Sequence, residues 1–572
     1  MKKIRLMNVV AALMATLVFA SCSEEVTSVA PVIAEDAIFA AKLNLKSIYD
    51  KSFGDGSAQS AKVMNALKSA LQTEEMPQQA LNILNKALEN PMAAFGLNLD
   101  QPVYLSATLD AQSEEAGIYL TASVSDRTML QMILEKSFAQ VEKETQTEKE
   151  YLESSEWYDG EYHLAGRETI QNGGKFYYFG GAADNAVCCA LTDNALIFYM
   201  SAKSLGAGGV KGKAAIEKLL SQKGVCQGTG IDKFMAAQDD MNLWLDVETF
   251  MEKAKPLIRR GDASVYMMLK QFEAFYKGMS LTAALDFQAG RTVVNMSATM
   301  SEELKEQSMK YYTQPTDKYF SYIPASSLVA ANLACNTAPL QEMWNELSGD
   351  ANVGSYIQAL KSFGIDERFV AGLPGTITAG LSVGMDGEPA VSLVMECDRK
   401  VYDVLMLLLV QHSGMVEDNG DGTYSIFEQN DYDDYDYDYG YGYLPTAKNY
   451  IGSLTYTDGA IVAMTSNLWN QSNGGRGFYN NYRMSSTADD IAKGGIALNL
   501  ESLDGKILDT VAKEMSEALR PVHMSSRDLL DYCTSVTITN PDMFTSEISM
   551  NMGDKEHNLL QKFVALLSDT IR

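Results

Sequence analysis

The sequence predicts an α+β fold made of two tandem copies of one unit, each with an antiparallel sheet and hairpins packed with amphipathic helices. Two observations carry this prediction. Strand-like runs are joined mostly by short polar turns, with helical runs between the hairpins, which is typical of α+β rather than doubly wound proteins. A series of local patterns also recurs in the same order about half a chain apart.

The recurring patterns define the two copies. The matched segments are 36–43 with 326–333, 95–97 with 363–365, 126–127 with 398–399, 192–195 with 457–460, and 243–246 with 496–499. Their separations are 290, 268, 272, 265 and 253 residues, as expected if the second copy has mostly lost loop residues without changing the order. We therefore predict a first unit over residues 34–316 and a second over residues 317–572.

Each element of the first copy follows from its periodicity. A buried strand is predicted at 36–45, a helix around Val63, and a hairpin from the strand runs 103–109 and 117–124. An edge-like strand is predicted around Leu243, and a closing hairpin pairs 280–286 with 292–300. Helices begin after Asp126 and Asp398, which can accept hydrogen bonds from free backbone N–H groups at the helix start.

The first residues indicate export and lipidation. Lys2, Lys3 and Arg5 precede an apolar run, and Ala20-Ser21 comes directly before Cys22. Residues 1–21 are therefore predicted to be a signal peptide that is cleaved between Ser21 and Cys22. The small residues before the cysteine resemble a bacterial lipobox, in which the cysteine carries acyl chains such as palmitate and holds the protein on a membrane. The alternative is an ordinary cleavable signal with an incidental cysteine.

The residues after Cys22 bear on location. Ser23, Glu24 and Glu25 resemble the surface-export signal of lipoproteins from Bacteroides-type bacteria. Residues 22–33 would then form an acidic tether to the outer membrane, with the body at the cell surface. The alternative is a solvated tether without a signal, and a body that faces the periplasm.

Composition excludes several function classes. The formal net charge is −28, and it becomes −31 when the three basic residues of the signal are removed. Such a charge repels phosphate backbones, so nucleic acid is not an expected partner. The six cysteines beyond Cys22 do not fall at matching positions in the two copies, and we interpret them as mostly buried free thiols. No zinc-type spacing of cysteine and histidine occurs, and no metal or cofactor is predicted.

The two copies differ most in two segments. The first copy is predicted to have a Glu- and Tyr-rich loop at 142–166, and the second an Asp/Tyr-rich loop at 430–443. Alternating Asp and Tyr cannot bury one face without burying charge, so an exposed loop is predicted. We interpret it as a possible interaction loop that could bind calcium or a basic partner, or else as a solubilising loop. Its candidate contact residues are Tyr432, Tyr435, Tyr437, Tyr439, Tyr441 and Tyr443.

Three short motifs resemble catalytic or binding motifs but fail on context. Ser382 lies in a Gly-x-Ser-x-Gly string, yet the sequence after it indicates a hairpin turn rather than the helix that a nucleophile elbow needs. Residues 207–214 approximate a phosphate loop but lack its terminal Ser or Thr. Residues 417–428 have EF-hand offsets, but they enclose a strand pattern that favours a β-turn. No catalytic residue is predicted.

The lipobox, the strand pattern that opens each half and the two-fold layout together resemble the Bacteroidetes lipoproteins grouped as domain of unknown function 4836. This resemblance implies the architecture only, because the family has no assigned activity. The sequence therefore predicts a lipid-anchored outer-membrane lipoprotein that is a non-enzymatic binding or scaffolding module for an unknown protein or glycan. The alternative is an exported hydrolase, for example glycan-cleaving, whose carboxylates come from distant positions.

Overall fold

The computed structural model shows an α+β protein with antiparallel sheets, as predicted. It describes residues 33–54, 56–71, 96–98, 100–110, 115–154, 162–170, 173–179, 181–182, 187–201, 210–222, 226–261, 263–271, 273–349, 353–373, 375–383, 388–412, 415–428, 449–518 and 525–570. The chain divides into unit 1, Met1–Ser301 with Glu556–Arg572, and unit 2, Glu302–Lys555.

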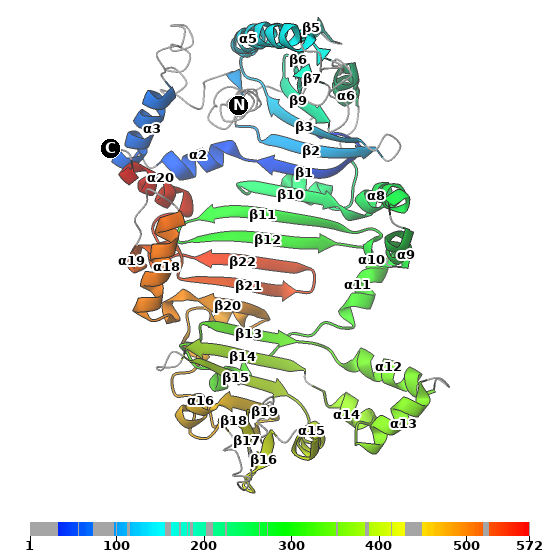
Figure 1. The fold of residues 1–572 in the computed structure, drawn as a ribbon, viewed down its shortest axis with the longest axis vertical. Helices are drawn as coiled ribbons and strands as arrows, with labels where there is room; N and C mark the ends of the chain where they lie inside the picture. Colours follow the sequence, from blue (N-terminus) through cyan, green and yellow to red (C-terminus); the bar gives the residue numbers. More distant parts are fainter. Residues whose placement is uncertain are drawn as a thin grey trace, which may run out of the picture. The chain divides into compact units, whose positions relative to one another are not determined.

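The described strands of the unit 1 sheet are antiparallel and lie side by side (Figure 1). In spatial order they are β12 (Arg291–Thr299), β11 (Ser280–Gln288), β10 (Met241–Asp246), β1 (Ala37–Leu43), β2 (Val103–Asp110), β3 (Glu115–Ser123), β9 (Ala195–Ser201), β8 (Val187–Leu191), β6 (Lys175–Phe179) and β5 (Gly166–Thr169). The two predicted hairpins, β2–β3 and β11–β12, are both present.

The helices of unit 1 connect or cover these strands. They are α2 (Leu45–Phe53), α3 (Ala58–Leu71), α5 (Arg127–Glu153), α6 (Val210–Ser221), α7 (Ile231–Ala236), α8 (Val247–Gly261), α9 (Ala263–Gln271), α10 (Glu273–Tyr276) and α20 (Leu559–Thr570), and β4 (Tyr162–His163) pairs with β7 (Gly181–Ala182). The C-terminal helix α20 packs on α2 and α3. It therefore belongs to unit 1, whereas the sequence pattern predicted that residues 317–572 form one unit.

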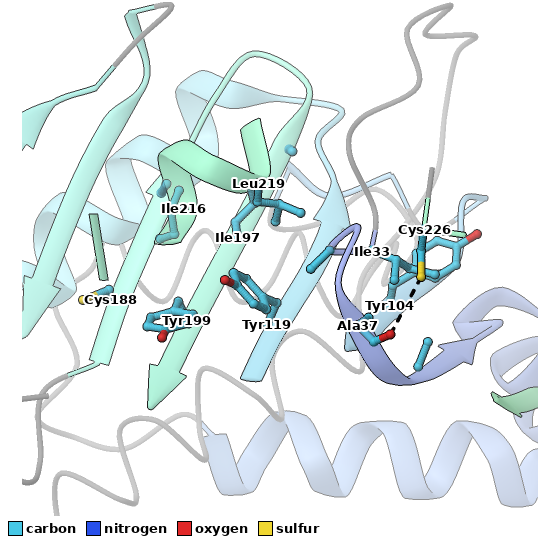
Figure 2. Packing of buried hydrophobic residues seen from close by; sticks show 14 of the residues in the cluster. Ile33, Ala37, Tyr104, Tyr119, Cys188, Ile197, Tyr199, Ile216, Leu219 and Cys226 are labelled. Atoms are coloured by element: carbon cyan, nitrogen blue, oxygen red, sulfur yellow. Dashed lines mark hydrogen bonds between the residues drawn. The ribbon is translucent and has the colours of Figure 1, made fainter. Parts of the chain in front are cut away.

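The core of unit 1 lies on both faces of its sheet. On one face, Ile216 and Leu219 of α6 pack towards Ile197, Tyr119 and Tyr199 (Figure 2). On the other face, α5 packs over β3, β6, β8 and β9. The side chain of Asp126 accepts from the backbone N–H of Met129 at 2.9 Å, which confirms its predicted role as the cap of α5.

The described strands of the unit 2 sheet are also antiparallel. Their spatial order is β22 (Thr545–Asn551), β21 (Ser535–Asp542), β20 (Gly495–Asn499), β13 (Val329–Ala334), β14 (Thr376–Val383), β15 (Pro389–Glu396), β19 (Ala460–Thr465), β18 (Tyr450–Thr457), β17 (Thr423–Phe427) and β16 (Val416–Asp418). In both units the first strand in sequence lies between the second strand and the strand that precedes the closing hairpin.

The described helices of unit 2 precede or connect its strands along the chain. They are α11 (Glu302–Met309), η3 (Lys318–Tyr322), α12 (Ala338–Gly349), α13 (Gly354–Ser362), α14 (Glu367–Ala371), α15 (Arg399–His412), α16 (Ser466–Gln471), η4 (Tyr482–Met484), α17 (Ala488–Ile491), η5 (Leu500–Ser502), α18 (Gly505–Ala518) and α19 (Ser526–Tyr532). Figure 1 shows α12, α13 and α14 beyond one end of β13 and β14.

The strand registers of the two units correspond residue by residue. In unit 1, Ala40 is opposite Ser106 on one side and Trp244 on the other. In unit 2, Ala330 is opposite Gly380 and Ala497. Ala40 and Ala330 are 290 residues apart, and Trp244 and Ala497 are 253 apart, which are two of the separations found in the sequence.

Two sequence predictions are wrong in detail. The segment 142–166 is not a loop throughout, because α5 continues to Glu153 and keeps Val141 and Thr145 buried. The strand around Leu243 is not at an edge, because β10 pairs with β1 and β11. In both cases tertiary packing on the sheet decides the structure, and the local composition does not reveal it.

Candidate binding face

The central strands of unit 2 bury their polar side chains and expose their aliphatic ones. Along β14, Thr376, Thr378 and Ser382 are buried, whereas Ile377 and Leu381 are exposed. Antiparallel sheets with one solvated face normally show the reverse alternation. The orientation is therefore the feature of unit 2 that needs a physical cause.

The buried polar side chains find partners among backbone carbonyls. Asn332 donates to the carbonyl oxygens of Ile491 and Ala492 at 3.3 Å each, at the end of α17, and accepts from Thr378 Oγ1 at 2.9 Å. Ser392 Oγ donates to the carbonyl oxygen of Tyr322 at 2.6 Å. The carbonyls at a helix end lack intrahelical partners, so these side chains satisfy groups that would otherwise be buried unpaired.

A second part of this inner network lies around Asn499. Its side chain accepts from Thr487 Oγ1 at 2.8 Å and donates to the carbonyl oxygen of Ser327 at 3.0 Å and to the hydroxyl of Tyr482 at 3.3 Å. Around it, η3, η4, α16 and α17 supply the apolar side chains that cover this inner face. The inner face is therefore covered by these elements.

The opposite face carries a group of exposed aliphatic side chains, which we name the open apolar face. Its members lie on five neighbouring strands and each is between 37% and 43% exposed: Leu333, Ile377, Leu381, Val383, Val391, Ile496, Leu498 and Ile538. The registers place Leu333 opposite Ile377, Leu381 opposite Val391, and Ile496 opposite Ile538. Monomeric proteins rarely expose contiguous apolar surface on this scale unless it binds something.

The open apolar face ends where α15 covers the sheet. Val401, Tyr402 and Met406 of α15 pack with Leu454 and Ile461 of β18 and β19. Complete burial of one such side chain contributes about 1.5–3 kcal/mol, and roughly two fifths of each of the eight remains exposed, so covering the face would contribute on the order of 5–10 kcal/mol before the costs of association. The face is thus large enough energetically to act as a binding surface.

Most of the corresponding positions of unit 1 are less exposed, although Ile118, which matches Val391 in the strand register, is 38% exposed. Leu43, Leu243 and Leu245 are half-buried, and α8 contacts β1, β2, β10 and β11. The inner face again carries a polar side chain: Lys42 donates to the carbonyl oxygens of Met235 (2.9 Å) and Ala237 near the end of α7. Burial lowers the pKa of Lys42, against the opposing effect of Asp239. Lys42 and Asn332, which occupy matching positions, thus both donate hydrogen bonds to backbone carbonyl oxygens near the end of a helix.

Two carboxylates in unit 1 come close together, as a hydrolase would require. Asp240, whose side chain is fully buried, accepts from Lys51 Nζ at 2.7 Å, from Ser47 Oγ at 2.6 Å and from the Phe287 N–H at 2.7 Å. Asp286 also pairs with Lys51. Burial alone would lower the pKa of Lys51, but the bonds to the two carboxylates outweigh it and raise the pKa. This network joins α2 to β10 and β11 and leaves Asp240 no access to a substrate.

The residues of the three short motifs have structural roles in a strand, a helix and a turn. Ser382 is buried in β14, which leads by a hairpin to β15, and its Oγ is 3.3 Å from Ser327 Oγ. Lys213 lies in α6 and pairs with Glu168 at 2.5 Å. Asp421 accepts from the Thr423 N–H in the β16–β17 turn, as predicted for a β-turn. Among the described residues, no group of histidine, cysteine and carboxylate side chains could hold a metal ion.

The six described cysteines are free thiols, as the sequence suggested. Cys188, Cys189, Cys226 and Cys397 are buried, whereas Cys335 is exposed. Burial raises the pKa of Cys188 to about 12 and that of Cys397 to about 11, which makes both thiols unreactive near neutral pH.

The lipidation and loop predictions lie outside the described residues. This applies to Ser21, Cys22, Ser23, Glu24 and Glu25, and to the six tyrosines of 430–443. The sequence pattern indicated candidate binding residues in these loops and did not indicate the open apolar face. The sequence signal for the open apolar face is the alternation of aliphatic side chains with small or polar ones in β14 and β20. Alternation alone does not say which face of the sheet is buried.

Comparison with known proteins adds no assignment. No family model matches the chain, and no curated protein matches it. Crystal forms III, IV and I of TP0453 match with 8%, 8% and 9% sequence identity. The form III match covers 50% of this chain and 86% of that chain, with a TM-score of 0.22, too low to carry an argument. In the described part of the chain, no helix has the length and apolarity to cross a membrane.

The acidic network generates a stability prediction. Asp240→Ala should lower the free energy of unfolding by about 1–3 kcal/mol, because Ser47 and the Phe287 N–H lose their buried acceptor while Lys51 keeps only Asp286. The matched control is Glu153→Ala, which removes the exposed pair with Lys149 and should cost less than about 1 kcal/mol. Denaturant titration of the two variants measures both; equal small losses would show that the network is not a structural tie.

The same network predicts a pH dependence. Burial alone would raise the pKa of Asp286, but the bonds from Lys51 and Gln288 outweigh it and lower the pKa. Its contribution is therefore complete at neutral pH and is lost as the pH falls through this lowered pKa, below the range where a free aspartate titrates. The penalty of Asp286→Asn in the free energy of unfolding, measured by denaturant titration at neutral pH, should therefore shrink over the same acid range.

Proposed function

We propose that the protein is an exported, non-enzymatic binding module, held on the outer membrane by acyl chains on Cys22, and that the open apolar face of unit 2 is its binding surface. The observation that carries the proposal is the exposure of eight aliphatic side chains on five neighbouring strands. A face of this kind costs solubility when it is unoccupied, and occupation by a partner explains its presence.

The chemistry of the face favours a protein partner over a glycan. The eight side chains are all Leu, Ile or Val, and they offer neither hydrogen-bonding groups nor aromatic rings. Sugar hydroxyls that lose water against such a face would remain unpaired, which is unfavourable. Apolar protein surface loses no hydrogen bonds on the same face, so we propose a protein partner.

The hydrolase alternative has less support. It needs two accessible carboxylates in a cleft, and the pair formed by Asp240 and Asp286 is held by Lys51, with Asp240 fully buried. That arrangement serves packing rather than catalysis.

We also propose that the two units arose by internal duplication, and that the architecture is that of the Bacteroidetes lipoproteins of domain of unknown function 4836. The common strand order and the matching registers around Ala40 and Ala330 support the duplication. On this account the open apolar face is a later change to one copy, and the Asp/Tyr-rich loop at 430–443 is a second candidate surface. The body is proposed to face outwards from the cell, with the periplasm as the alternative.

The lipid anchor is tested by Cys22→Ser. The variant should lose incorporated palmitate and move from the membrane fraction to the soluble fraction, because the acyl chains supply the membrane affinity. Metabolic labelling followed by fractionation measures both, with Cys335→Ser as the matched cysteine control. A Cys22→Ser variant that still labels and sediments with membranes would contradict the anchor.

The binding surface is tested by crosslinking in intact cells. A photo-crosslinking amino acid placed at Leu381 or Ile496 should yield a discrete covalent adduct, because both positions lie on the open apolar face. The same amino acid at Tyr479, which is 92% exposed and lies outside this face, is the control and should yield none. Illumination followed by immunoblotting detects the adducts, and their absence at both face positions would contradict the proposed function.

A further inference from the structure

We propose that the open apolar face binds an amphipathic α-helix whose polar side is cationic. This inference rests on the proposed function and deepens it, because it names the class of partner. It follows from the shape of the face and from the charge of the unit that carries it.

The shape of the face suits a helix. Five strands spaced about 4.8 Å apart span about 19 Å, which equals the length of a helix of about 13 residues. The side chains of the face are short and branched and come from neighbouring strands of one sheet, so they form a broad apolar floor. An aliphatic stripe along a helix is the complementary surface for such a floor.

The charge of unit 2 selects the polar side of that helix. Residues 302–555 contain 36 Asp and Glu residues against 16 Lys and Arg residues. Exposed carboxylates lie close to the face in sequence: Glu388 precedes Val391 in β15, and Glu501 follows Leu498. A helix with Lys and Arg on its outer side would be attracted to this unit, whereas an acidic helix with the same stripe would be repelled.

The same charge disfavours two other occupants. A second copy of the chain would bring an equally acidic unit against this one, and an anionic bilayer surface would also be repelled at moderate salt. Both occupants could bury the aliphatic side chains, but both would work against the charge. The cationic helix satisfies both features.

The test uses full-length protein and three labelled 18-residue peptides. The first places Leu on one helical face and Lys on the other, the second replaces every Lys by Glu, and the third scrambles the Leu/Lys sequence. Fluorescence anisotropy should show that the Leu/Lys helix binds at least tenfold more tightly than either of the others. Its affinity should fall as salt is raised from about 50 mM to 500 mM, because screening weakens the attraction.

Variants localise the binding. Leu381→Ser combined with Ile496→Ser should weaken binding of the Leu/Lys helix at least tenfold, because it places hydroxyl groups at the centre of the apolar floor. The control combines Tyr479→Ser with Met484→Ser, which are exposed residues of unit 2 outside the face, and should leave binding unchanged. Circular dichroism melting of both double variants confirms that they fold.

Three results would overturn the inference. The first is equal binding of the scrambled and the Leu/Lys peptides, and the second is unchanged peptide binding by the Leu381→Ser, Ile496→Ser variant. The third is that the Leu/Lys peptide does not bind, while the protein self-associates or binds anionic vesicles and the double variant loses that binding. The crosslinking experiment separates the two levels of the proposal. Adducts at Leu381 with no peptide binding would reject the cationic helix alone, whereas loss of both would reject the binding face as well.

Discussion

The orientation of the unit 2 sheet depends on hydrogen bonds between its strands and the carbonyl groups of the elements packed beneath it. Asn332 satisfies two carbonyls at the end of α17, and Ser392 satisfies the carbonyl of Tyr322. An unpaired buried polar group costs about 1–3 kcal/mol, so turning the sheet over would leave several such costs at once. Because side chains alternate along a strand, the polar residues that face inwards oblige their aliphatic neighbours to face outwards.

The same constraint operates in unit 1 with a different residue. Lys42 meets the carbonyls of Met235 and Ala237 near the end of α7, in the position that Asn332 occupies in unit 2. A charged side chain and an amide thus provide donors to the same kind of acceptor. At Leu43, Leu243 and Leu245 the face opposite Lys42 is less exposed than the matching positions opposite Asn332, so the two units share the inner constraint and differ on the outer face.

The elements that the sequence predicts correctly are those decided by local pattern. The β2–β3 and β11–β12 hairpins and the cap at Asp126 follow from alternation, turn residues and a short carboxylate. The helical part of 142–166 was not predicted, because its polar composition resembles a loop, whereas α5 buries Val141 and Thr145 against the sheet and continues to Glu153.

The open apolar face could not be predicted for a related reason. The alternation in β14 shows which residues share a face, but the decision between the two faces depends on carbonyls contributed by α17 and η3, which are distant in sequence. Hydropathy alone would predict that Ile377 and Leu381 are buried and that Thr378 and Ser382 are exposed. The candidate surface therefore lies on the strands themselves and not in the predicted loops.

The central claim is that the aliphatic side chains of these strands face solvent in the free protein. Carbene footprinting of the intact protein, read by peptide mass spectrometry, tests it directly. Leu381 and Ile496 should be labelled strongly, while Val394 and Val462, which lie on the same sheet with 0% exposure, should not. Labelling of Leu381 and Ile496 no greater than that of Val462 would contradict the account.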